Sequence, residues 1–332
     1  MIETVDYHTA GEPFRIVVSG APELPGATVA DRRERALASG EAGAARRLLC
    51  HEPRGHADMY GCFLVPPDDD GAELGVLFWH KDGFSTACGH GTIALGAFAV
   101  ESGRVSAPPD GELDLRIDVP SGRVLARVRM RAGLVDSVVF QNVPAYVLAR
   151  EVVVDTSRGP LAVDVSYGGA IYASLDAVAA GLAAEPGRLQ ELIALGREVK
   201  GALEGSEHAR HPSDPRQSGI YGTILWDEVA GAGLAQRNVT VFADGEVDRS
   251  PCGSGTSARL ALLYADGRLG SGEELQHLSV IGSEFRGRVV EEVSAEGRPA
   301  VVTEIEGRAF RTGEHRFVLD ERDELRDGFV LR

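Results

Sequence analysis

The chain has 332 residues, about twice the length of a typical single domain, and its 34 basic and 50 acidic side chains leave a net charge of −16. Such an acidic chain has no general affinity for nucleic acids or anionic membranes, because both bind basic surfaces. Hydrophobic residues make up 43% and charged residues 25%, as in a folded globular protein. We therefore expect two globular domains or one large one, without a general basic surface for nucleic acids or membranes.

The cysteines indicate free thiols in a reducing compartment. They are widely scattered and form no C-x-x-C pair, which argues against a disulfide framework: Cys50, Cys62, Cys88 and Cys252. The N-terminal sequence MIETVDYHTAGEP lacks the apolar core of a secretory signal, and no apolar run is long enough to span a bilayer. We expect a cytoplasmic protein.

Short β-rich stretches dominate the first part of the chain. Residues 14–19 and 74–80 have the apolar and β-branched content of strands, and 112–128 alternates around a Pro-Ser-Gly turn that predicts a hairpin. Between them, 30–50 is rich in Ala, Arg, Glu and Leu, which predicts one helix despite Gly40 and Gly43.

A similar rhythm follows in the second part. Strand patterns cover 135–147, interrupted by Pro144, and begin again after Arg150. Residues 188–203 then predict a helix, and 208–222 is a loop by its content of Pro, Ser and Gly.

One motif occurs twice. Cys88-Gly89-His90-Gly91-Thr92 and Cys252-Gly253-Ser254-Gly255-Thr256 lie 252 − 88 = 164 residues apart, and each precedes a helix-compatible apolar stretch. Each stretch ends at a glycine suited to a helix C-terminus, Gly103 or Gly267. We interpret the pair as a duplication with two equivalent helix N-termini.

A cysteine in the first turn of a helix is a candidate acid–base group. Unpaired N–H groups and the helix dipole favour the thiolate, and glycines let main-chain donors approach a carboxylate closely. Two such thiols facing one cleft could remove a proton from a carbon acid on one side and return one on the other. The alternative is that both cysteines are buried apolar residues, which the matching frames make the weaker interpretation.

Other site types fit the residues poorly. Cys50, His51, Glu52 and His56 resemble a metal cluster, but Pro53 and the spacing do not suit a helical H-E-x-x-H site, so we predict no metal. Both glycine clusters match only a loose form of the dinucleotide fingerprint, and no G-x-S-x-G nucleophile elbow is present.

The sequence resembles the proline racemase family, which includes 4-hydroxyproline 2-epimerases and trans-3-hydroxy-L-proline dehydratases. The resemblance covers most of the chain and is carried by 6–12 (DYHTAGE), 52–61 (EPRGHADMYG), the two cysteine motifs with DRSP before the second, and 282–285 (GSEF). It implies an α/β (α+β) fold like that of the diaminopimelate epimerases, with two pseudo-symmetric domains. Each domain would be a curled mixed sheet around a central helix, with the active site between the domains. The expected division is 1–148 with 310–332, carrying Cys88, and 149–309, carrying Cys252.

The resemblance also implies the chemistry of the site. Cys88 and Cys252 would act on opposite faces of the substrate α-carbon without a cofactor, in a protein that is typically a homodimer. The other implied substrate-binding residues surround the carboxylate, the ring nitrogen and the ring: Gly89, His90, Gly91, Gly253 and Ser254 for the carboxylate and reacting carbon, Asp248 with His90 for the nitrogen, and Tyr60 and Phe242 for the ring walls. Each has a structural alternative: Asp248 as a turn residue, His90 as a polar neighbour and Phe242 as core.

Two cysteines favour epimerisation over dehydration, because dehydratases of the family usually replace one cysteine with threonine or serine. Gly91 and Tyr60 depart from the asparagine and phenylalanine that proline racemases tend to carry, and a phenol can hydrogen-bond a ring hydroxyl. Ala87 departs in turn from the methionine common in the epimerases. We predict a 4-hydroxyproline 2-epimerase that converts trans-4-hydroxy-L-proline to cis-4-hydroxy-D-proline. Proline racemisation, trans-3-hydroxy-L-proline dehydration, inversion of another amino acid and non-catalytic amino-acid binding remain alternatives.

Overall fold

The computed structural model describes residues 1–231 and 233–331, which divide into two compact units. The first unit comprises Met1–Val138 and Arg308–Arg332, and the second comprises Val139–Gly307. The predicted boundary between 148 and 149 falls inside strand β9 (Ala145–Thr156), which pairs with β10 (Gly159–Tyr167) of the second unit. The division therefore lies about ten residues earlier than the sequence pattern placed it.

The first unit is a mixed sheet with a buried helix. Its strands pair in the order β18–β1–β2–β3–β4–β6–β7, and β2–β3 and β4–β6 are the parallel steps. Helices α1 (Val29–Ala38) and α2 (Gly40–Cys50) connect β2 to β3, and α3 (Gly89–Glu101) precedes β6. The strands are β1 (Ile2–Thr9), β2 (Glu12–Ser19), β3 (Gly61–Val65), β4 (Leu74–His80), β5 (Gly83–Phe84), β6 (Gly111–Val119), β7 (Gly122–Arg131), β8 (Leu134–Gln141, which crosses the boundary) and β18 (Ala309–Phe317).

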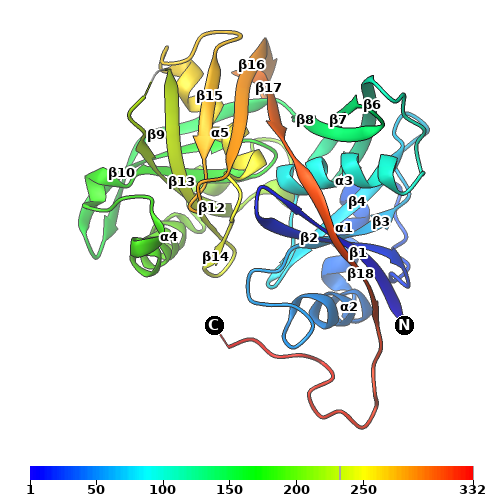
Figure 1. The fold of residues 1–332 in the computed structure, drawn as a ribbon. Coiled ribbons are helices and arrows are strands. Elements are labelled where there is room, and N and C mark those ends of the chain that lie inside the picture. Colours follow the sequence, from blue (N-terminus) through cyan, green and yellow to red (C-terminus); the bar gives the residue numbers. More distant parts are fainter. Residues whose placement is uncertain (232, 332) are drawn as a thin grey trace. The chain divides into compact units, whose positions relative to one another are not determined.

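The second unit is a closed ring of strands around a helix. The ring runs β9–β10–β11–β12–β13–β15–β16–β17 and returns to β9, with parallel steps at β11–β12 and β13–β15. Helix α5 (Gly253–Ala265) lies among these strands and is buried from Gly253 to Leu263 (Figure 1). The remaining strands are β11 (Ile171–Asp176), β12 (Ile220–Glu228), β13 (Leu234–Phe242), β14 (Glu246–Val247), β15 (Glu274–Leu278), β16 (Glu284–Ala295) and β17 (Arg298–Gly307).

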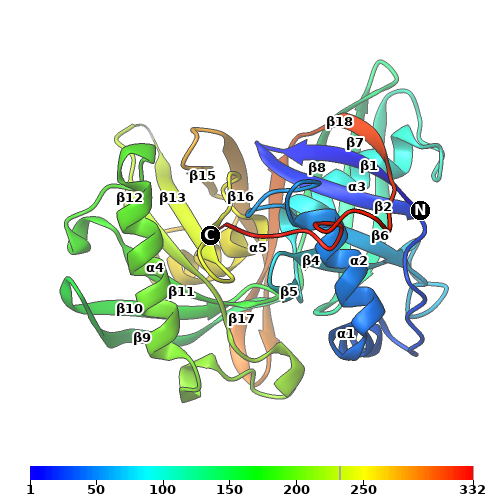
Figure 2. The same cartoon turned by 90° about the horizontal axis from the view of Figure 1, so that it is seen from below.

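Helix α4 (Leu189–Leu203) lies on the outside of this ring against β12 and β13 (Figure 2). Its buried positions recur at helical spacing, so one apolar stripe faces the strands while the other face meets solvent: Leu192, Leu195, Gly196, Val199 and Leu203. The predicted helix at 188–203 is therefore confirmed, and short 3-10 turns flank it at Pro186–Arg188 and Glu207–Ala209.

The two units repeat one topology. In each unit, two antiparallel strands come first, and outer helices then lead to a strand that is parallel to the second of them. The next strand is antiparallel to that one and ends in a short hairpin. A cysteine and the buried helix follow. The strand after that helix returns parallel to the strand before it, β6 beside β4 and β15 beside β13. The predicted pseudo-symmetric α+β fold, with a curled mixed sheet around a central helix in each domain, is confirmed at this level.

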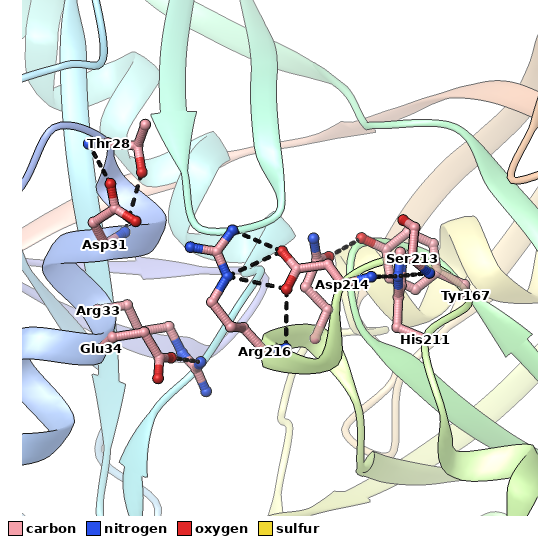
Figure 3. Close-up of polar contacts among 10 residues, drawn as sticks. Thr28, Asp31, Arg33, Glu34, Tyr167, His211, Ser213, Asp214 and Arg216 are labelled. Carbon is pink, nitrogen blue, oxygen red and sulfur yellow. Dashed lines mark hydrogen bonds and ion pairs between the residues drawn. The ribbon is translucent and has the colours of Figure 1, made fainter.

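Two local predictions need correction. The single helix expected over 30–50 is two helices, because Ser39 ends α1 and its hydroxyl accepts the N–H of Ala42 to begin α2. At the start of α1, Thr28 and Asp31 form a reciprocal capping box (Figure 3). The sequence pattern merged the two helices because Gly40 follows directly on Ser39 and both segments favour helix.

The segment 208–222, expected to be a loop, has ordered internal contacts. The backbone N–H groups of Ser213 and Asp214 both donate to Nδ1 of His211, and Asp214 pairs with Arg216 at 2.9 Å (Figure 3). Pro215–Gln217 forms a 3-10 turn, and strand β12 already begins at Ile220. Short side-chain contacts, which composition does not reveal, organise this connection. Among the helices of the described residues, none is long and apolar enough to cross a membrane.

Candidate active site

Cys88 caps the buried helix of the first unit. It is the N-cap residue of α3, with extended backbone (φ −157°), and its Sγ accepts the N–H of Gly91 at 3.2 Å. Thr92 donates its hydroxyl to the Cys88 carbonyl at 2.8 Å, and Thr9 of β1 binds the His90 carbonyl at 2.9 Å. The first turn of α3 is thus fixed from both sides, and the sulfur lies where the helix N-terminus favours an anion.

His90 places an imidazole next to this sulfur. Its Nε2 lies 3.4 Å from Cys88 Sγ, and burial lowers the pKa of His90 to about 3. The ring is therefore neutral at physiological pH, and it can donate or accept a hydrogen bond without bringing a charge. This arrangement does not supply an imidazolium for a substrate carboxylate.

Aromatic rings enclose His90. Its ring meets Tyr60 edge-on at 4.9 Å between centroids and Phe14 edge-on at 5.7 Å. The Tyr60 hydroxyl is hydrogen-bonded to the hydroxyl of Ser85, in the segment that leads to Cys88. Tyr60, predicted as a ring wall, therefore lies beside His90 in the group of residues around Cys88. Phe14 is a neighbour that the sequence did not reveal.

Gly91 is required by close packing. A Cβ at this position would lie 2.5 Å from the Phe14 ring and 2.7 Å from Cys88 Sγ. The glycine that departs from the proline racemase pattern therefore leaves room for Phe14 and for the sulfur.

Cys252 caps the buried helix of the second unit in a different backbone conformation. Its φ is +64°, in the left-handed region that non-glycine residues rarely adopt. Its N–H donates to Ser250 Oγ at 3.1 Å, and the Ser250 hydroxyl donates to Asp248 Oδ1 at 2.7 Å. Asp248 also accepts the Ser250 N–H at 2.8 Å, so the DRSPC segment is a compact turn tied to its own carboxylate.

Burial and charge control the ionisation of this pair. Burial, and then the nearby Asp248 charge, raise the pKa of the Cys252 thiol, while hydrogen bonds from Tyr172 and the Gly255 N–H oppose that rise. Burial also raises the pKa of Asp248, against hydrogen bonds from Ser250. Cys252 is therefore a protonated thiol at neutral pH, ready to give a proton rather than to take one.

Ser254 and three aromatic residues complete the group of residues around Cys252. The Tyr172 hydroxyl lies 2.7 Å from Ser254 Oγ and 3.7 Å from Cys252 Sγ. Tyr221 meets Tyr172 edge-on and stacks on Phe242, with centroids 5.6 and 5.7 Å apart. Phe242, predicted as a ring wall, thus belongs to an aromatic group that also touches the sulfur.

The family assignment follows from a comparison over nearly the whole chain. The profile of the family described as proline racemase matches residues 4–330. The chain belongs to the proline racemase family.

Individual relatives agree with this assignment. The chain is 44% identical over 332 residues to a 3-hydroxyproline 2-epimerase of Burkholderia multivorans and to a trans-3-hydroxy-L-proline dehydratase of Burkholderia cenocepacia, covering 100% of this chain and 98% of each relative. Among solved structures, a hydroxyproline epimerase of Agrobacterium vitis with bound trans-4-hydroxy-L-proline is 34% identical, with a TM-score of 0.94, covering 99% of this chain and 94% of that one.

Strand register allows this family member's two halves to be compared residue by residue. Trp79 of β4 and Val241 of β13 both face the outer helices, and each lies one pair before the last pair of its hairpin, so the two positions are equivalent. Register from that pair makes Phe14 equivalent to Tyr172. It likewise equates the following pairs: Val76 with Asn238, Ser85 with Asp248, and Ile117 with His277.

Several residues around the sulfurs were not among the predicted site residues. They lie on strands and outside the cysteine motifs: Thr9, Phe14, Tyr172, Tyr221, Asn238 and His277. Thr9 belongs to DYHTAGE, so the family segment gave a signal for it, whereas Tyr172 and His277 stand in ordinary strand patterns. Only the pairing of strands identifies those two.

The cysteine-histidine cluster at 50–56 is a packed turn. Cys50 is buried at the end of α2, with its Sγ 3.9 Å from the carbonyl of His80. His56 accepts the backbone N–H of Asp58, and the His51 N–H bonds back into α2. These contacts account for the segment as the connection that leads to Tyr60.

Proposed function

We propose that the chain is a cofactor-independent 2-epimerase of a hydroxyproline, with Cys88 and Cys252 as the two proton-transfer groups. The supporting observation is the repeated cysteine at the N-terminus of topologically equivalent buried helices. In the first unit the sulfur accepts a helix N–H directly, and in the second the Gly255 N–H favours the ionised sulfur. A pair of cysteines kept only for packing has no need of that repeated arrangement.

In the proposed reaction, one sulfur acts as thiolate and removes the α-proton, and the other acts as thiol and protonates the opposite face. Inversion at the α-carbon results, and the two sulfurs exchange protonation states. The raised pKa of Cys252 makes it the acid in the resting state. Backbone N–H groups at Gly89 and Gly253 would receive the carboxylate, and Asp248 the ring ammonium.

The position of the ring hydroxyl is the finer question. Our sequence-based prediction for the substrate is trans-4-hydroxy-L-proline. The Agrobacterium vitis relative, which is 34% identical to this chain, has that compound bound. The relatives at 44% identity, however, have names that refer to 3-hydroxyproline. We therefore propose trans-3-hydroxy-L-proline as the first substrate to test and trans-4-hydroxy-L-proline as the second.

Dehydration of trans-3-hydroxy-L-proline is the competing outcome, favoured by the names of several relatives. Loss of the hydroxyl needs one base at the α-carbon, whereas inversion needs an acid on the opposite face as well. The presence of both cysteines supports inversion.

The test is a substrate panel followed by NMR in D₂O. Trans-3-hydroxy-L-proline, trans-4-hydroxy-L-proline and L-proline are incubated separately, and α-deuterated D-epimer is the expected product from a hydroxyproline. Formation of a cyclic imine without D-epimer would assign dehydration instead. Binding of pyrrole-2-carboxylate, a planar mimic of the deprotonated substrate, with no α-proton exchange in any compound would mean that the protein binds and does not catalyse.

The rate should show a bell-shaped dependence on pH, because activity requires one ionised and one protonated sulfur at the same time.

A further inference from the structure

A buried chain of hydrogen bonds ends on the backbone of Cys252. Asn238 Nδ2 lies 2.9 Å from His277 Nε2, His277 Nδ1 lies 2.8 Å from Thr256 Oγ1, and the Thr256 hydroxyl donates to the Cys252 carbonyl at 2.8 Å. All three side chains are almost fully buried.

The direction of this chain is determined by its ends. The amide nitrogen of Asn238 can only donate, so His277 Nε2 accepts. His277 Nδ1 then carries the proton and donates to Thr256, whose own proton goes to Cys252. Burial lowers the pKa of His277 to about 3, which agrees with this neutral tautomer.

Asn238 and Thr256 of this chain, together with Ser250, hold the peptide groups on both sides of Cys252. Asn238 Nδ2 also donates to the Pro251 carbonyl at 3.0 Å, and Ser250 Oγ accepts the Cys252 N–H. A non-glycine residue in the left-handed region is strained and persists only where its surroundings impose it. The hydrogen bonds to Pro251 and Cys252 are such surroundings.

The first unit provides the internal contrast. Cys88 is extended rather than left-handed, although Thr92 donates to its carbonyl at the same 2.8 Å. At the positions equivalent to Asn238 and His277, that unit has the apolar residues Val76 and Ile117. The connection before the cysteine also differs, because Ser85 to Ala87 follows β5 in one unit and the longer Asp248 to Pro251 follows β14 in the other. The polar chain thus accompanies the left-handed cysteine only.

We propose that His277, together with Asn238 and Thr256, is a positioning group that holds Cys252 in the left-handed conformation and so fixes where its sulfur meets the substrate. This inference rests on the proposed function, in which Cys252 transfers a proton. It assigns a catalytic purpose to residues that do not touch the substrate.

The test compares four variants, in each of which the new side chain is close in volume to the one it replaces. Thr256→Val and His277→Leu remove the hydrogen bonds, Thr256→Ser keeps the hydroxyl, and Thr92→Val removes the matching bond in the first unit. For each, kcat and KM are measured with the substrate found by the panel. In the same samples, mass spectrometry gives the alkylation rate of Cys252 relative to Cys88 with iodoacetamide, and thermal unfolding reports stability.

Thr256→Val and His277→Leu should lower kcat by roughly tenfold to a hundredfold with little change in KM, since a displacement of about 1 Å has that effect on a reacting group. Their Cys252-to-Cys88 alkylation ratio should fall, because a displaced sulfur loses the Gly255 N–H, which favours the thiolate. Thr256→Ser should restore both values, and Thr92→Val should lower kcat less than Thr256→Val does.

Lower thermal stability with an unchanged alkylation ratio and unchanged kcat would overturn the proposal and leave these residues a structural role. The alkylation ratio needs no turnover, so it tests the positioning even if no proline derivative is epimerised. A protein that turns over nothing but shows the altered ratio would contradict the proposed function and support the positioning.

Discussion

The two cysteine-bearing units share a topology and differ in what surrounds the sulfur. Cys88 has relaxed backbone beside a neutral imidazole enclosed by Phe14 and Tyr60. Cys252 has left-handed backbone beside an acidic residue, Asp248, and a phenol. A duplicated frame therefore places two chemically identical groups in different electrostatic settings. In the proposed reaction, this difference would set one sulfur as acid and the other as base without any difference in residue type.

The largest effect should follow from removing either sulfur as an acid–base group. Cys88→Ser and Cys252→Ser should each lower net epimerisation by roughly a thousandfold or more, since a hydroxyl is a far weaker acid than a thiol and the two groups act as a unit. Chiral separation of the products measures this loss. Cys50→Ser is the control, because Cys50 is buried as the last residue of the outer helix α2 and has no part in the proposed reaction.

Substantial epimerisation by either active-site variant would show that one thiol suffices, and the two-base comparison between the units would then be wrong.

Replacing the glycines three residues after each cysteine should reduce stability by unequal amounts. Gly91→Ala forces a methyl group to within 2.5 Å of the Phe14 ring, whereas Gly255→Ala meets mainly Cys252 Sγ at 2.9 Å, an atom that can rotate. We expect Gly91→Ala to cost about 1–3 kcal/mol of stability and Gly255→Ala less. Urea unfolding compares them. Both should lose activity, because each methyl group displaces a sulfur.

A milder test replaces Tyr172 with phenylalanine, the residue that the first unit has at the equivalent position 14. The Tyr172 hydroxyl lowers the pKa of Cys252, so its removal should raise that pKa further. The alkaline limb of the pH–rate profile should then move to higher pH. We expect a loss in kcat of about tenfold, in the range of one lost hydrogen bond to a charged group. An unchanged pH profile would show that the hydroxyl serves only Ser254.

The duplicated fold was predictable because its signals are local. A cysteine, two glycines and an apolar helix recur at a fixed separation, and strand patterns such as that of 74–80 match the observed limits of β4. The predicted site residues of each half also lie together: His90 and Tyr60 with Cys88, and Asp248, Ser254 and Phe242 with Cys252.

What the sequence did not reveal depends on register and backbone conformation. The left-handed φ of Cys252 accompanies a longer connection before it and a buried chain of hydrogen bonds, and nothing in Cys-Gly-Ser-Gly-Thr distinguishes it from Cys-Gly-His-Gly-Thr in that respect. His277 lies beside Thr256 only because β15 returns parallel to β13, and a single-residue shift would point it to the other face. Such contacts are properties of strand pairing rather than of motifs.

The smallest expected effect is a difference between the two units in how they make stability depend on pH. Burial raises the pKa of Asp248, which stands where the first unit has the uncharged Ser85. A carboxyl whose folded pKa is raised stabilises the protein fully below its unfolded pKa of about 4, and that contribution is lost as the pH rises through the folded value. Asp248→Asn should therefore gain stability relative to wild type between about pH 4 and 7. Urea midpoints over this range measure the difference, and parallel curves would mean that Asp248 is ionised at no cost in the folded protein.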